Sequence, residues 1–134
     1  MKKYEKAIAS GKRSVELLPN GAQFKMVLGS TLGYAGRFDE ALVHLKQAIR
    51  LNPFPAFYDY YYLGLCYMFK GQFEDALTEF KKLVQRVPKS WIGHWSLAIN
   101  YIYLDRNEKA RASAAKALEL NPNLSVSYFL KISK

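Results

Sequence analysis

Residues 60–88 read YYYLGLCYMFKGQFEDALTEFKKLVQRVP, and three landmarks of this segment recur along the chain. They are the pair Leu63-Gly64, then Ala76, then Pro88. The same landmarks stand 35 residues earlier as Leu28-Gly29, Ala41 and Pro53, and 34 residues later as Leu97-Ala98, Ala110 and Pro122. One period shared by three landmarks predicts an array of repeated units, each packed on its neighbours.

Each period has the pattern of two helices. In residues 73–84 apolar side chains recur every three or four positions, as on one face of an α-helix. Acidic residues open this segment and Arg86 lies near its end, which complements the helix dipole. Pro88 ends the helix because the residue before a proline is disfavoured in helical geometry. Gly36, Gly71 and Asp105 mark the turns inside their units. We expect helices at 2–17, 22–35, 38–51, 57–70, 73–86, 91–104, 107–120 and 124–132.

The units resemble the tetratricopeptide repeat, in which a large residue, Leu-Gly, an aromatic residue, Ala with an aromatic four positions on, and Pro follow one another. The resemblance implies an all-α fold: a right-handed superhelical solenoid of antiparallel helix pairs. Small residues such as Gly64 and Ala76 then lie where two helices approach closely, and Ala7 is the equivalent of Ala76 in the first unit. The residues that carry the match are Lys25, Leu28, Gly29, Leu32, Ala41, Leu45 and Pro53; Tyr60, Leu63, Gly64, Tyr67, Ala76, Phe80 and Pro88; and His94, Leu97, Ala98, Tyr101, Ala110, Ala114 and Pro122.

The whole chain, 1–134, is predicted to be a single array. Residues 1–20 form the second helix of a partial repeat, 22–55, 57–90 and 91–124 are repeats, and 125–134 start a further helix. Because the terminal helices lack partners, we expect the chain to be cut from a longer protein or its ends to be covered by another chain. The linkers 51–55 and 120–125 also resemble those of the repeat region that follows the catalytic domain in many bacterial adenylate/guanylate cyclases.

Composition limits the function classes. The 134 residues carry 20 Lys+Arg against 11 Asp+Glu, a net charge of +9, which favours encounter with acidic partners. Cys66 is the one cysteine, so neither an internal disulfide nor a four-cysteine zinc site is available. No apolar run reaches the roughly 18 residues of a membrane span, and no signal peptide pattern opens the chain. We expect a soluble, cytoplasmic protein.

The resemblance places the first helix of each unit on the concave side of the solenoid. The inward positions of the second unit are then Gln23, Met26, Ser30 and Tyr34, whereas those of the later units are apolar and aromatic. Such side chains are enriched at interface cores, and we predict that they bind a peptide or helix with apolar anchors, or a second copy of the chain. Internal packing between neighbouring units is the alternative. The predicted groove residues are Tyr58, Tyr61, Leu65, Met68, Phe69, Ile92, Trp95, Ile99 and Tyr103.

Other functions are less well supported by the residues. A clamp for a C-terminal carboxylate needs inward Lys, Arg and Asn, but Tyr61 and Trp95 stand at such positions. His44 and His94 stand alone, Cys66 is expected to be a buried inert thiol, and no catalytic, cofactor or metal-ligand spacing is present. We therefore expect no enzyme. The rival functions are a basic nucleic-acid-binding array, which lacks regular base-reading side chains here, and a regulatory module of a nucleotide cyclase. The basic residues of the second helices and turns are expected to lie on a solvated convex face.

Overall fold

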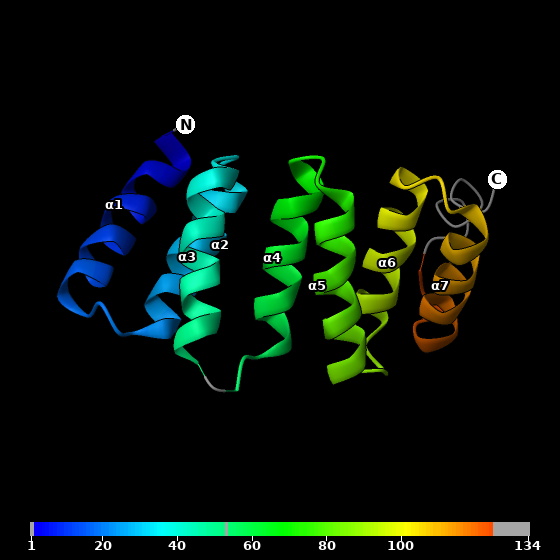
Figure 1. Cartoon of the computed structure of the whole chain (residues 1–134). Helices are drawn as coiled ribbons and strands as arrows, with labels where there is room; N and C mark the ends of the chain where they lie inside the picture. The colour runs from blue at the N-terminus through cyan, green and yellow to red at the C-terminus, as the bar shows by residue number, and fades with distance from the viewer. Residues whose placement is uncertain (1, 53, 125–134) are drawn as a thin grey trace.

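The computed structural model describes residues 2–52 and 54–124, which form seven α-helices and, within those ranges, no β-strand (Figure 1). Four of the expected helices (2–17, 38–51, 73–86 and 107–120) agree with the observed bounds at both ends, and three (22–35, 57–70 and 91–104) end one residue earlier than expected. The expected eighth helix lies outside the described residues except for Leu124, which is in a bend. The helices are α1 (Lys2–Leu17), α2 (Ala22–Tyr34), α3 (Phe38–Leu51), α4 (Phe57–Phe69), α5 (Phe73–Arg86), α6 (Trp91–Tyr103) and α7 (Asn107–Leu120).

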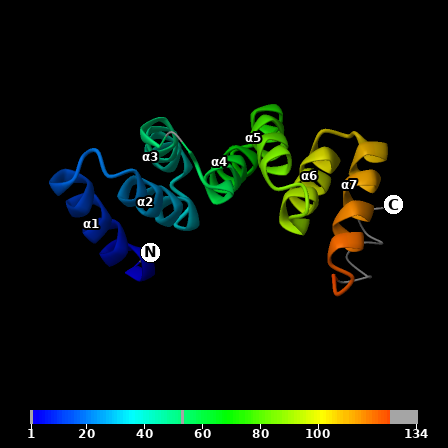
Figure 2. The same ribbon diagram turned by 90° about the horizontal axis from the view of Figure 1, so that it is seen from below.

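The helices stack side by side as an all-α solenoid. The pairs α2/α3, α4/α5 and α6/α7 make the most extensive helix–helix contacts, and α1 packs on α2. In Figure 2 the row of helices is bent, with α3 and α5 on the outer side and α2 and α4 on the inner side. In agreement with this view, α2 also contacts α4.

Small residues let the paired helices nest. A Cβ added to Gly64 would lie 2.5 Å from the Phe80 ring, and one added to Gly29 would lie 2.7 Å from Leu45. Ala76 of α5 has no exposed surface, and neither does Phe80, whose ring fills the space left open by Gly64. The predicted role of the recurrent small residues is thus confirmed for these pairs.

The turns inside the units also follow the predicted equivalence. Gly36 and Gly71 have φ values of 82° and 81°, and Asp105 has a φ of 60° at the matching place. These are left-handed backbone conformations, which glycine adopts freely and which aspartate adopts more readily than most other residues. The three turns therefore share one geometry although their residues differ.

The expectation for Ala7 was wrong. Ala7 is exposed, whereas its neighbour Ile8 is buried in the core with Leu28 and Leu32 of α2. Ala41, at the equivalent place in α3, is buried where α3 packs on the first helix of its own unit. Ile8, rather than Ala7, is therefore the residue of α1 that packs against α2.

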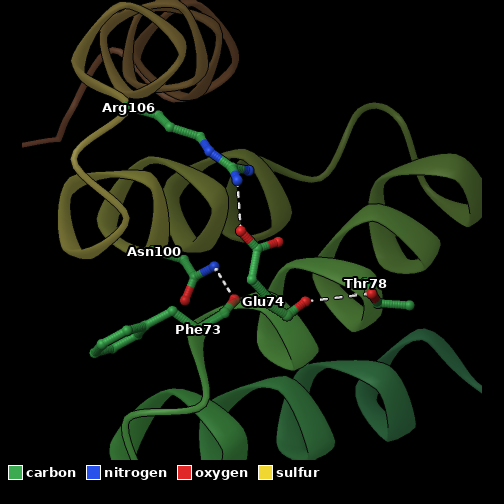
Figure 3. A network of polar contacts seen from close by, with 5 residues as sticks. All are labelled: Phe73, Glu74, Thr78, Asn100 and Arg106. Atoms are coloured by element: carbon green, nitrogen blue, oxygen red, sulfur yellow. Dashed lines mark hydrogen bonds and ion pairs between the residues drawn. The ribbon is translucent and has the colours of Figure 1, made fainter.

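Polar contacts join the second and third complete units (Figure 3). Asn100 of α6 has no exposed surface, and its side-chain amide donates a hydrogen bond to the Phe73 carbonyl at 2.8 Å. Arg106, just before α7, reaches back to the carboxylate of Glu74 at 2.5 Å. Within α5, Thr78 donates its hydroxyl hydrogen to the Glu74 carbonyl at 3.3 Å.

Candidate partner-binding surface

An apolar pocket lies on the inner side of the solenoid, between α2 and α4. Its volume is about 40 Å³, and it opens onto exposed aromatic rings. Tyr34 and Phe69 are 60% and 63% exposed at its edge, so their rings offer contact area to a partner. The lining residues are Ser30, Gly33, Tyr34, Phe38, Tyr62, Leu65, Cys66 and Phe69.

The aromatic rings of this pocket are held by one another. Phe38, at the beginning of α3, stacks on Phe69 with ring centroids 5.7 Å apart. Tyr34 meets Tyr62 edge to face at 6.1 Å, and Tyr62 meets Tyr61 at 5.7 Å. Rings that are ordered before binding lose little conformational freedom when a partner arrives. The surface is therefore preorganised for apolar contact.

Two ionisable groups of the pocket lining, the Tyr62 hydroxyl and the Cys66 thiol, are uncharged at neutral pH because burial raises their pKa values. Burial, followed by a hydrogen bond with Tyr34, raises the pKa of the Tyr62 hydroxyl to about 12. Burial likewise raises the pKa of Tyr61. Burial raises the pKa of the Cys66 thiol to about 11, so the thiol stays protonated and poorly nucleophilic at neutral pH. The prediction that this thiol is buried is confirmed.

The nine predicted groove residues differ in how much surface they present. Tyr58, Phe69 and Tyr103 are more than half exposed. Met68, in contrast, is buried in the core cluster of α4–α7, against which Tyr61, Leu65 and Ile99 pack. Ile92 and Trp95 are half-buried on α6. The structure brings only Leu65 and Phe69 of the nine into the pocket between α2 and α4.

Tyr103 is held away from that pocket. Its ring stacks on Phe73 of α5, with centroids 4.8 Å apart and planes 1° from parallel. The predicted residues Ile92, Trp95, Ile99 and Tyr103 all belong to α6, whereas the pocket is walled by α2 and α4. The α6 residues therefore lie outside this pocket, and their place on the inner surface and their role in binding stay predictions.

Three aromatic residues of the pocket lining, Tyr34, Tyr62 and Phe38, are absent from the predicted groove. The positions of the first two in the sequence could have indicated that they line it. Tyr34 stands at an inward position of the second unit, and Tyr62 lies three residues before Leu65 and seven before Phe69, on the same face of α4. The run Tyr60-Tyr61-Tyr62 hides this register, because any one of the three rings fits an inward stripe. Phe38 begins a second helix, and nothing in the pattern points it at a first-helix groove.

His, Cys, Asp and Glu side chains are dispersed among the described residues. Among them no cluster of three or more His, Cys, Asp or Glu side chains could hold a metal ion. The His94 ring nitrogen Nε2 lies 2.8 Å from the Pro88 carbonyl oxygen, so this histidine ties the beginning of α6 to the preceding loop. None of the helices in the described ranges has the length and apolar character required to cross a membrane.

Stacked helix hairpins with an open, apolar inner surface define a class of protein-interaction scaffolds, and the sequence comparison agrees. Residues 26–90 and 94–124 match family models described as tetratricopeptide repeat. Together these segments cover well over half of the chain. The chain belongs to the tetratricopeptide repeat family.

Solved structures with a similar fold include several of MamA. One matches with a TM-score of 0.88 at 18% identity, covering 97% of this chain and 74% of that chain. MamA from Desulfovibrio magneticus RS-1 matches with a TM-score of 0.82 at 22% identity, over 89% of this chain and 67% of that one. Likeness at this level of identity shows the shared fold.

A curated relative matches over a shorter segment. Human (Homo sapiens) anaphase-promoting complex subunit 7 is 36% identical over 52 residues, which are 39% of this chain and 9% of that protein. The chain thus spans only a small part of this relative's length, and the match concerns repeat units within it.

Proposed function

We propose that this chain is a scaffold that holds a peptide or helix of a partner protein through apolar anchors on the inner side of the solenoid. Tyr34, Tyr62, Leu65 and Phe69 receive the anchor, and the inner residues of α6 extend the contact. The single observation that carries the proposal is the pocket between α2 and α4, whose rings are prearranged yet remain exposed at its edge.

Physical reasons favour this use of the surface. Exposed apolar rings that gather at one place are costly in water unless a partner covers them. Aromatic side chains dominate the binding energy of many interfaces because they bury much area with few rotatable bonds. The uncharged tyrosine hydroxyls at the pocket also satisfy polar atoms of a bound backbone.

The experiment is a selection from a random-peptide library on the wild-type chain and on the double variant Tyr34→Ala/Phe69→Ala. Wild type should enrich peptides with an aromatic or large aliphatic anchor, and the double variant should bind them about tenfold more weakly or worse. Phe54→Ala is the matched control, because Phe54 is 80% exposed in the loop between α3 and α4 and lies outside the pocket. Equal binding to the double variant, with an unchanged circular dichroism spectrum, would refute the proposal.

A second copy of this chain is the other occupant that an observation supports. Ala7 is exposed on α1, and Leu17 and Leu18 at the end of this helix are 69% and 52% exposed. Sedimentation equilibrium at several concentrations measures this association directly. A mass that stays monomeric at every concentration would exclude self-association. If the mass rises with concentration in wild type but not in Tyr34→Ala/Phe69→Ala, the inner pocket is the site of the association.

A further inference from the structure

The helix α4 separates two different surfaces. Its side chains Tyr62, Leu65 and Phe69 face the inner pocket. At 100° per residue, Leu63 and Tyr67 lie on nearly the opposite side of the helix, together with Tyr60. This outer side of α4 is the floor of a second groove, flanked by α3 and α5 on the outer side of the bend (Figure 2).

This outer groove has a volume of about 300 Å³ and is basic. One wall is α3, where Lys46 and Arg50 stand four residues apart and therefore on one face. The other wall is α5, where Lys82 lines the groove and Arg86 follows it at the same spacing. Lys46, Arg50 and Lys82 thus line the same opening, and Arg86 lies about one helical turn beyond Lys82 on the same wall.

Tyrosine rings hold three of these cations in place without neutralising them. The Lys46 Nζ atom lies 5.3 Å from the centroid of the Tyr67 ring. The Lys82 Nζ atom and the Arg86 Cζ atom both lie 5.9 Å from the centroid of the Tyr60 ring. A cation over an aromatic face keeps its full charge and loses side-chain freedom before any ligand binds.

The groove has too few carboxylates to balance its cations. Glu79, whose side chain is 10% exposed, is the one acidic residue in its lining, and its Oε2 atom lies 3.3 Å from Lys82 Nζ. Within the described part of the chain, Lys46, Arg50 and Arg86 form no ion pair. Burial raises the pKa of Asp59, and the positive charge of Arg86 opposes this effect. The Asp59 carboxylate is buried at the beginning of α4, where it accepts a hydrogen bond from the Ala56 amide. Three cations therefore meet one carboxylate in the groove lining, and Arg86 adds a fourth positive charge next to it.

We propose that the outer groove between α3 and α5 binds an acidic segment of a partner protein. Asp or Glu side chains about one helical turn apart would pair with Lys46 and Arg50 on one wall and with Lys82 and Arg86 on the other. This site is separate from the inner pocket, so the scaffold can hold an apolar anchor and an acidic segment on opposite faces of α4.

A protein segment fits the groove better than a nucleic acid does. Single-stranded nucleic acids gain much of their affinity from bases stacked on open aromatic faces. Here Lys46 covers Tyr67, and Lys82 and Arg86 cover Tyr60. What remains accessible is a short clamp of positive charge, which suits carboxylates on flexible side chains.

The test uses fluorescence anisotropy with a labelled decaglutamate peptide and the full chain. Lys46→Gln/Lys82→Gln should weaken binding by about fivefold to tenfold, because two charged contacts are lost. Lys81→Gln/Lys89→Gln is the matched control, since it removes the same charge from exposed residues outside the groove lining. This control should weaken binding less than about twofold. Equal losses in both double variants, or no binding by wild type, would overturn the proposal.

A second variant predicts a change of opposite sign. Glu79→Gln removes the carboxylate of the groove and should tighten decaglutamate binding about twofold or more. Glu119→Gln on α7 is the matched control, because Glu119 also pairs with a lysine three residues away, Lys116. This variant should leave the affinity unchanged. Weaker binding by Glu79→Gln contradicts the proposed site. If wild type binds a single-stranded oligothymidylate more tightly than decaglutamate, and Lys46→Gln/Lys82→Gln loses this binding, the groove is assigned to nucleic acid instead.

Discussion

At the scale of single residues, the shared geometry of the units depends on two distinct properties of glycine. Gly64 sits in a helix with ordinary backbone geometry, and its lack of a Cβ makes room for the Phe80 ring. Gly71 has nothing within 4 Å of its missing Cβ, and the turn requires its φ of +81°. The first glycine serves packing between helices, and the second serves the direction of the chain.

Gly64→Ala is expected to destabilise the protein by about 2 kcal/mol, because an added Cβ would overlap the Phe80 ring in a closely packed core. Helix propensity alone predicts the opposite sign, a gain of about 1 kcal/mol. Urea denaturation followed by circular dichroism measures the difference. When Gly64→Ala is combined with Phe80→Leu, the loss of stability should be smaller than the sum of the two single losses. A higher denaturation midpoint for Gly64→Ala than for wild type would show that the two helices are not in contact there.

At the scale of helices, neighbouring units are joined along one edge by recurring charges. Asp39 in the first turn of α3 pairs with Lys70 at the end of α4, and Glu74 in the first turn of α5 pairs with Arg106 before α7. Each carboxylate thus lies at a helix N-terminus, where the dipole favours it, and each cation comes from the following unit. The landmarks of the repeat do not predict the pairs, because Lys70 and Arg106 are not equivalent positions.

The pair of Glu74 and Arg106 should contribute little to stability because both side chains are exposed, 62% and 41% respectively. A double-mutant cycle of Glu74→Gln and Arg106→Gln is expected to give a coupling of about 0.5 kcal/mol at low ionic strength. Salt near 1 M should reduce it toward zero. Asp39→Asn combined with Arg106→Gln is the control, and its effects should add. A coupling that is unchanged by salt would mean that packing, not charge, joins these residues.

Buried Asn100 shows how one unit adapts to its neighbour. Cys66 occupies the equivalent place one repeat earlier, and both side chains are buried where a first helix meets the preceding unit. Asn100 donates to the Phe73 carbonyl, whereas its own oxygen has no hydrogen-bond partner among the described residues. The equivalence of the two positions predicts burial, and the position of Phe73 decides which hydrogen bond the amide makes.

At the scale of the whole molecule, titrating side chains limit the pH range of greatest stability. On the acidic side, burial lowers the pKa of His44 from 6.5, with Lys25 and Lys12 adding to the effect and Glu40 opposing it. On the alkaline side, burial raises the pKa of Cys66 from 9.0 to about 11 and that of Tyr62 from 10.0 to about 12. In both cases the unfolded chain reaches the charged form first as the pH leaves the neutral range.

The melting temperature is therefore expected to be highest near pH 7 to 8.5. Below pH 6.5 the unfolded chain binds a proton at His44 before the folded chain does, so stability falls with falling pH. Above pH 9 the unfolded chain releases the Cys66 proton first, which removes on the order of 2 kcal/mol by pH 11. Melting curves from pH 5 to pH 11 measure both limbs. Cys66→Ala should make the alkaline limb shallower, and an identical limb in this variant would contradict the assignment.

Local patterns along the chain are enough to predict the helices, their pairing within units and the turns that join them. These patterns are apolar residues at helical spacing, small residues such as Gly29 and Gly64 at one period, and Gly71 or Asp105 where the backbone needs a positive φ. Which surfaces adjoin between units is not encoded in such patterns and depends on the packing in three dimensions. The pocket of α2 and α4, the basic groove of α3 and α5, and the contact of Arg106 with Glu74 all depend on how far each unit is rotated against the last. That rotation results from the packing of many side chains distant in sequence, so no single spacing along the chain encodes it.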